Sequence, residues 1–149
     1  PRSGGMKNAA THNANTANLI DLARNTQYNG KAAVEDPLLR DRIMRQLIRE
    51  TALEENQRRT RVPALLEHPA RLQLQNKLLR SEIAQETAAL ALEVAGASAS
   101  LYLGDQNAPA AGQWPLAYMS TYGNTIAAGT SEVQRNILGE RVLSLAKSK

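Results

Sequence analysis

The sequence has no cysteine and no phenylalanine, and only two of its 149 residues are histidine. Without thiols it can form neither disulfides nor thiolate metal sites, and it suits a reducing compartment. We therefore expect a cytoplasmic location. Each histidine, His12 or His68, lies in a polar or proline-containing segment without a second ligand at i+3 or i+4. We expect no metal site.

Several motifs are also missing. The sequence has no apolar run of about 18 residues and no signal peptide at its start, so we expect no membrane span. The nine glycines form neither a G-x-G-x-x-G nor a Walker pattern, which excludes nucleotide cradles of those types. Nucleophilic catalysis is not indicated, because there is no G-x-S-x-G turn and no serine–histidine pairing.

The net charge of +4 comes from 18 basic and 14 acidic residues that are spread along the chain. Aromatic residues make up only 3%, so stacking platforms for nucleic acid are scarce, and we expect no nucleic-acid partner. The run EENQRRTR, residues 54–61, allows two interpretations, a polyanion patch or the solvated face of a long helix. We favour the solvated face.

Apolar residues amount to 42% of the chain and recur with a helical period of 3.6. These features predict an all-α fold in one helical-bundle domain covering residues 1–149. The bundle is expected to run up and down, with four helices. Because residue 1 is proline and not methionine, we expect a piece of a longer protein.

Local signals predict the helices. A first helix is expected to end around 17–23, with the sequence Tyr28 to Gly30 stopping it. A helix of roughly 25 residues begins at Asp36, the expected N-cap, with Pro37 in its first turn and Leu39, Ile43, Met44, Leu47 and Ile48 in its apolar stripe. A third helix, the most buried, spans 71–96, followed by a loop at 97–113 and a short helix around 114–123.

The last helix begins near Gly129. The hydroxyl of Thr130 or of Ser131 can accept a hydrogen bond from the N–H groups of its first turn. Glu132 lies in that first turn, where its charge suits the helix dipole. Val133, Ile137 and Val142 are expected to face inward. Such a helix start can bind an anion or a polar ligand, although most such caps serve only their own helix.

Residues 129–137, Gly-Thr-Ser-Glu-Val-Gln-Arg-Asn-Ile, closely resemble the C-terminal signature of the flavin-dependent acyl-CoA dehydrogenases. The helix order upstream resembles that family's C-terminal domain, a four-helix bundle that packs against neighbouring subunits. The resemblance implies a C-terminal fragment of an enzyme that holds FAD between subunits and dehydrogenates an acyl-CoA thioester in lipid metabolism. A carboxylate takes the α-proton, and the flavin takes the β-hydride.

The match with that family is incomplete. Many members place the catalytic Glu directly before the Gly-Thr of the signature, where this chain has Ala128. Residues 1–20 contain no Asp or Glu, so the alternative base on the first helix lies upstream or on a partner, and we assign no catalytic residue. Leu92 replaces a Gln of the family's Gln-x-x-Gly-Gly segment, of which Gly96 remains. By resemblance, the residues that line FAD are Thr130, Glu132, Gly129, Ser131 and Arg24. Arg24 belongs to the segment ARNTQYNG, residues 23–30.

Three functions follow as hypotheses. The leading one is a domain of an acyl-CoA dehydrogenase that contributes FAD contacts and an interface within a homo- or hetero-oligomer. In the second, the parent subunit is a non-catalytic partner in a mixed oligomer, which Ala128 and Leu92 favour. The third is a helical bundle used only for association, or a weak polyanion binder. The fragment alone is expected to be inactive.

Overall fold

The computed structural model describes residues 14–67 and 72–147. Almost all of its regular elements are helical, as the 3.6-residue period predicts. The α-helices and strands, in chain order, are α1 (Thr16–Asn25), β1 (Gln27–Tyr28), β2 (Lys31–Ala32), α2 (Pro37–Arg59), α3 (Leu72–Ala95), α4 (Gln113–Ile126) and α5 (Ser131–Arg141). Short 3-10 turns join them at Ala33–Glu35, Pro63–Leu65, Gly96–Ser100 and Pro109–Gly112.

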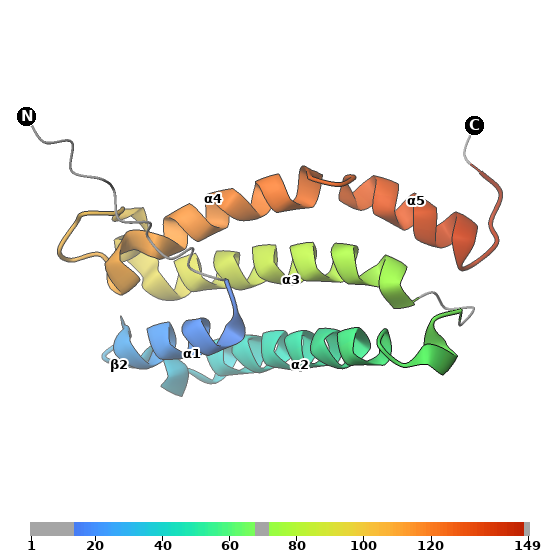
Figure 1. The fold of residues 1–149 in the computed structure, drawn as a ribbon. Helices are drawn as coiled ribbons and strands as arrows, with labels where there is room; N and C mark the ends of the chain where they lie inside the picture. The colour runs from blue at the N-terminus through green and yellow to red at the C-terminus, as the bar shows by residue number, and fades with distance from the viewer. Residues whose placement is uncertain (1–13, 68–71, 148–149) are drawn as a thin grey trace, which may run out of the picture.

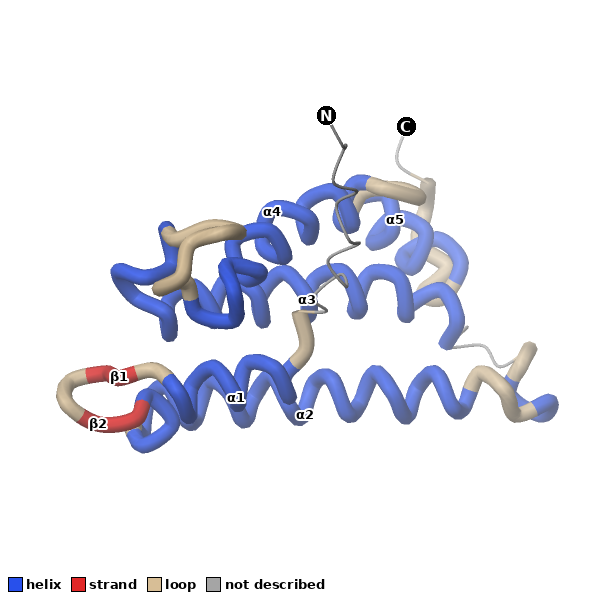
Figure 2. Tube along the Cα trace, turned by 60° about the vertical axis from the view of Figure 1, so that its left-hand side comes forward, coloured by secondary structure: helices blue, strands red, loops and turns tan. Residues whose placement is uncertain are grey.

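The helices lie in layers (Figure 1). Helices α1 and α2 form one side, α3 runs through the middle, and α4 and α5 follow one another along the other side of α3. The view turned by 60° shows the same arrangement (Figure 2), with the β1–β2 hairpin projecting at the end of α1. The central position of α3 confirms the expectation that the third helix is the most buried. Its buried side chains contact neighbours on both sides.

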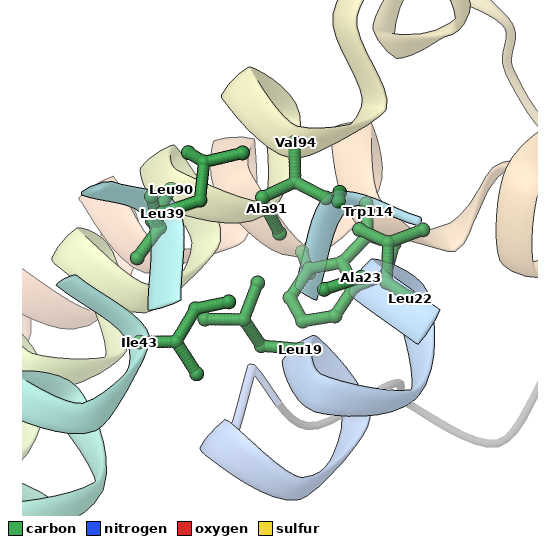
Figure 3. Close-up of a cluster of buried hydrophobic side chains, with 11 residues drawn as sticks. Leu19, Leu22, Ala23, Leu39, Ile43, Leu90, Ala91, Val94 and Trp114 are labelled. Carbon is green, nitrogen blue, oxygen red and sulfur yellow. The ribbon is translucent and has the colours of Figure 1, made fainter. Parts of the chain in front are cut away.

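The main core lies where α1, α2, α3 and the start of α4 meet (Figure 3). Trp114, only 1% exposed, stands beside Leu22 and Ala23 of α1. Small residues of α3, such as Ala91, allow its neighbours to approach closely. The buried apolar members of this cluster are Leu19, Leu22, Ala23, Ala33, Leu39, Ile43, Leu90, Ala91, Val94, Trp114 and Ala117.

Helix α2 begins as predicted, with Pro37 as its first residue and the Asp36 carboxylate accepting from the N–H groups of Leu38 and Leu39, both at 3.0 Å. Charged pairs along its length then join it to α3. Arg42 pairs with Glu93, and Arg49 pairs with Glu86. The buried Leu39 and Ile43 set which face of α2 lies inward, and the ion pairs lie along the edge of that contact.

Two connections between elements require glycine, one for its positive φ and one for the close approach of two main-chain segments. At Asn29 and Gly30 both φ angles are positive, 50° and 78°, which is the turn that joins two-residue hairpin strands such as β1 and β2. The sequence predicted a stop there, and the stop is a hairpin. Gly112, at φ 72°, lies so close to the main chain of Tyr102 and Leu103 that no Cβ fits.

Three sequence expectations need correction. Val133 does not face inward, since it is 46% exposed, and no residue of α5 is buried, because α5 contacts only α3 closely among the helices. Met44 and Ile48 were assigned to the apolar stripe of α2, yet they are 45% and 64% exposed. The helix expected at 114–123 is longer and ends at Ile126. The helices within residues 14–67 and 72–147 lack the combination of length and hydrophobicity that a membrane span requires.

Candidate functional site

The predicted site residues of the last helix gather at the α4–α5 turn, residues 127–130, and in the first turn of α5. Ala128 and Gly129 adopt left-handed conformations, with φ of 56° and 97°. Thr130 is the N-cap of α5, and its hydroxyl accepts from the Val133 N–H at 3.4 Å. Thr130 is therefore the cap that the sequence assigned to either Thr130 or Ser131. The turn lies at the surface, with Ala128 exposed and Gly129, Thr130 and Ser131 half-buried.

Two side chains hold the carbonyl groups of this turn. Lys77, on α3, donates from Nζ to the Gly129 carbonyl at 2.5 Å and to the Thr125 carbonyl at 3.4 Å. Gln134, on α5, donates from Nε2 to the Ala128 carbonyl at 2.9 Å. These bonds satisfy carbonyls that the end of α4 and the following turn would otherwise leave to solvent.

The N–H groups of the same turn stay available. Within residues 14–67 and 72–147, neither the Gly129 nor the Thr130 N–H donates to a protein acceptor. They lie next to the N-terminus of α5, where the helix dipole adds a positive potential. Such an arrangement can bind an oxygen of an anionic or polar ligand.

The charges around the turn have both signs. The pKa of Glu132 is lowered, first by a hydrogen bond from its own main-chain N–H, then by the Thr130 hydroxyl, and further by Arg135. Its carboxylate is therefore ionised at neutral pH and accepts hydrogen bonds from hydroxyl or amine groups. Arg135 is in turn paired with Glu82 of α3, a second charged contact that ties α5 to α3.

A cavity of about 1060 Å³ runs along α4, and none of residues 127–130 lines it. Its walls come from α3 and α4, with Asn15 and Glu50 on the side of α1 and α2. Lys77 lines it as well, so the same side chain borders the cavity and holds the turn. Most of the lining residues are of polar types, with Gln73, Asn76, Lys77, Arg80, Ser81, Gln113, Ser120, Thr121 and Asn124 among them.

Arg24, the remaining predicted site residue, lies elsewhere. It is in the last turn of α1, next to the hairpin. Figure 1 shows that end of α1 and helix α5 toward opposite ends of the molecule. Its side chain is 65% exposed and pairs with Asp21 at 3.5 Å. The single chain therefore does not bring Arg24 together with residues 129–132. A ligand that used both would have to be long or held by different copies of the domain.

Residues 127–130 are Ala, Ala, Gly and Thr, and none of these side chains can take a proton from carbon. In particular, the residue directly before Gly129 is Ala128. Metal chemistry finds no support in the part of the chain that the structure describes, where no group of three His, Asp or Glu could hold an ion. His12 and His68, which the sequence treated as isolated, lie outside the described residues.

Sequence reasoning missed Lys77 and Gln134. Lys77 precedes Gly129 by 52 residues, and no local pattern links a lysine in one helix to a turn in another. The Gln134 contact spans only six residues, but it depends on the left-handed turn, which brings the side chain back over Gly129.

Comparison with known families gives a match over most of the chain. The family model described as "Acyl-CoA dehydrogenase, C-terminal domain" matches residues 4–143. The acyl-CoA dehydrogenase IpdE1 of Mycobacterium tuberculosis is 32% identical over 131 residues, which cover 88% of this chain and 31% of that protein. IpdE1 of Mycolicibacterium smegmatis is 30% identical over 132 residues, 88% of this chain and 30% of that protein. The chain thus spans about a third of the length of these relatives.

Solved structures share the fold. The ChsE4–ChsE5 complex from Mycobacterium tuberculosis contains a chain that matches with a TM-score of 0.75 and 22% identity, covering 89% of this chain and 35% of that one. A structure described as the Tcur3481–Tcur3483 steroid ACAD matches with a TM-score of 0.73 and 19% identity, covering 89% of this chain and 34% of that one.

Proposed function

This chain belongs to the acyl-CoA dehydrogenase family, and we propose that it acts as the C-terminal domain of an FAD-dependent acyl-CoA dehydrogenase. The observation that carries the proposal is the α4–α5 turn, where the family signature coincides with two main-chain N–H groups that have no acceptor among the described residues and lie at a helix start. The remainder of the enzyme, including most of the acyl-CoA site, would come from other domains.

The residues of the turn fit a flavin nucleotide in specific ways. Gly129 at φ 97° has no side chain to keep a ligand away from the main chain, and a Cβ there would press against Gln134 Nε2 at 3.0 Å. The N–H groups of Gly129 and Thr130 suit phosphate or carbonyl oxygens. The Glu132 carboxylate suits a donor such as a ribose hydroxyl. Ser131, half-buried beside them, can donate or accept.

The flavin nucleotide bound at the turn of one subunit can also contact Arg24 of another subunit. Its exposed guanidinium suits a diphosphate, for which it provides both charge and paired donors. Because Arg24 lies far from residues 129–132 of its own chain, we propose that within one chain the two face different cofactor molecules. Each cofactor would then meet residues 129–132 of one subunit and Arg24 of another. An interface with another subunit would also account for the exposure of Val133 on α5 and of Leu143 just after that helix.

Bound FAD would supply hydride acceptance from the β-carbon of the acyl group. The chain's own residues would hold and orient the nucleotide and exclude water, but none would move the α-proton. Ala128 offers only a methyl group at the position where many members carry the base. The base therefore lies in another part of the enzyme or in another subunit.

A second candidate function is a non-catalytic subunit of a mixed oligomer, and Ala128 is the observation that favours it. The fold also occurs in a structure of two different chains, the ChsE4–ChsE5 complex. In that case the domain keeps the interface while a partner subunit supplies the base and much of the cofactor site.

One experiment separates these functions. We would express the full-length protein alone, measure its bound flavin by absorbance, and assay dehydrogenation of a panel of acyl-CoA thioesters with an artificial electron acceptor. A flavin-loaded, active homo-oligomer supports the catalytic function and removes the partner function. A protein that gains flavin and activity only with a second family member supports the partner function. A protein that never takes up flavin contradicts both.

A further inference from the structure

We propose that Lys77 is a positioning residue for the α4–α5 turn and acts together with Gln134. By holding the carbonyls of Gly129 and Ala128, these side chains set the direction in which the Thr130 and Gly129 N–H groups point. What those N–H groups bind rests on the proposed function, but their orientation follows from contacts within this chain.

Peptide geometry links the two ends of each bond. A trans peptide unit is planar, and its C=O and the next residue's N–H point in opposite directions. Lys77 Nζ holds the Gly129 carbonyl at 2.5 Å, so the Thr130 N–H must point away from Lys77. Gln134 Nε2 holds the Ala128 carbonyl at 2.9 Å, so the Gly129 N–H must point away from Gln134. Two side chains thus orient two consecutive donors.

The turn needs such support because its backbone is strained. Ala128 has a φ of 56°, a conformation that costs a residue with a Cβ energy and persists only where surrounding contacts impose it. The turn itself is at the surface and has little packing, since Ala127 and Ala128 are both exposed. The hydrogen bonds from Lys77 and Gln134 are the contacts that select this conformation over others.

Lys77 is placed to do this through a rigid element. It is half-buried and lies on α3, the central helix, next to the buried Leu78. Its ammonium group also meets the Thr125 carbonyl in the last turn of α4, where the helix dipole favours a positive charge. Lys77 therefore joins the turn, through Gly129, to both α3 and the end of α4. The orientation of the donors is thereby tied to the core.

The test uses the full-length protein and four variants. Lys77→Met keeps the length of the side chain and removes its donors, and Lys77→Arg restores donors. Gln134→Met removes the second contact. Lys31→Met, at an exposed lysine of β2, removes the same charge far from the turn. We would measure the FAD dissociation constant by flavin fluorescence, and hydrogen exchange by mass spectrometry in peptides spanning 123–135.

We expect Lys77→Met to weaken FAD binding about tenfold, in the range of a hydrogen bond to a charged group. Lys77→Arg should recover most of that loss, a rescue that a general effect on stability would not produce. The Ala127 and Gln134 amides, which donate to Gly123 and Thr130 at 2.9 Å, should exchange severalfold faster in Lys77→Met. Gln134→Met should change both measurements in the same direction, and Lys31→Met should leave the exchange rates of these peptides unchanged.

The outcomes distinguish the positioning role from the proposed function. If the wild-type protein binds FAD and Lys77→Met keeps both its affinity and its exchange rates, the positioning role is wrong while the proposed function stands. If the wild type binds no FAD, the proposed function is wrong, and the hydrogen-exchange rates alone test the positioning role of Lys77. Faster exchange at the turn in Lys77→Met, but not in Lys31→Met, then supports the positioning role, and equal exchange overturns it.

Discussion

The Glu50 carboxylate of α2 accepts a hydrogen bond from the main-chain N–H of Thr16, 2.8 Å away, at the first residue of α1. Thr16 is completely buried, so this N–H has no access to water. The carboxylate of one helix therefore completes the N-terminus of another, in addition to Asn15, whose side chain accepts from the Asn18 N–H. The contact positions α1 on α2 at the edge of the polar cavity.

Replacing Glu50 with Gln should destabilise the protein. The amide oxygen can still accept, but the charge that suits the start of α1 is lost, so we expect a cost of about 1 kcal/mol. Glu50→Ala should cost more, about 2 kcal/mol, because the Thr16 N–H is then buried without a partner. Thermal unfolding of the full-length protein measures both. The control is Glu54→Gln, an exposed residue one turn later on α2, and an equal loss there would refute the role of Glu50.

Ala128→Gly should stabilise the α4–α5 turn. Alanine at φ 56° pays a steric cost that glycine avoids, and this outweighs the larger entropy that glycine loses on folding, leaving a net gain of about 0.5 kcal/mol. Ala127 is exposed too, but its φ is −56°, so Ala127→Gly should lower stability. Denaturant unfolding of both variants tests the pair. Stabilisation by both, or by neither, would contradict this reading of the turn.

Gly112→Ala should be strongly destabilising. A Cβ at this buried position would overlap the main chain of Tyr102 and Leu103, which has no flexible end that could move aside. The left-handed φ of 72° adds its own cost, and we expect a loss of about 3 kcal/mol in total. Gly104→Ala is the matched control, since its φ is 93° but nothing lies within 4 Å of the added Cβ. It should lose only about 1 kcal/mol.

The ion pair between Arg42 and Glu93 should contribute a pH-dependent stability. The hydrogen bond from Arg42 lowers the pKa of Glu93 below its ordinary 4.5 in the folded protein. A lowered folded pKa means that the contribution is fully present above the unfolded pKa and is lost as the pH falls through the folded one. Both side chains are about half exposed, so solvent screening keeps the effect small.

The measurement for this pair is the melting temperature of wild type and Glu93→Gln between neutral pH and pH of about 3, a range that brackets the usual pKa of Glu. Glu93→Gln should be less stable near neutral pH and converge with wild type in acid. The difference should also shrink in high salt. Glu35→Gln, an exposed glutamate outside the long helices, serves as control. A gap that stays constant with pH would show that Glu93 acts by packing and not by charge.

Local chemistry made much of the fold predictable. Asp36 and Pro37 indicated the start of α2, and the structure has the cap and the first residue at those positions. Thr130 was one of two residues expected to cap α5. These features depend on hydrogen bonds between neighbours in the sequence, which a motif can encode. The apolar stripes predicted the bundle, a solved structure shares the fold, and the family model and a curated relative confirm the family.

The errors have a common cause. Met44, Ile48 and Val133 all fall on a helical apolar period, yet each is more than 40% exposed. Periodicity shows which side chains share a face but not whether another element covers it. The binding roles of Arg24 and residues 129–132 stay predictions, because they depend on groups beyond this chain.

Sequence alone determined the starts of α2 and α5, the helical character of the chain, and that Ala128 offers no carboxylate, because these depend on residue identity and short-range hydrogen bonding. Only the tertiary structure decided that Lys77 meets Gly129, that Glu50 completes α1, and that Arg24 lies apart from α5. Such contacts join residues many positions apart, and their geometry is set by how whole helices pack, which no local pattern in the chain specifies.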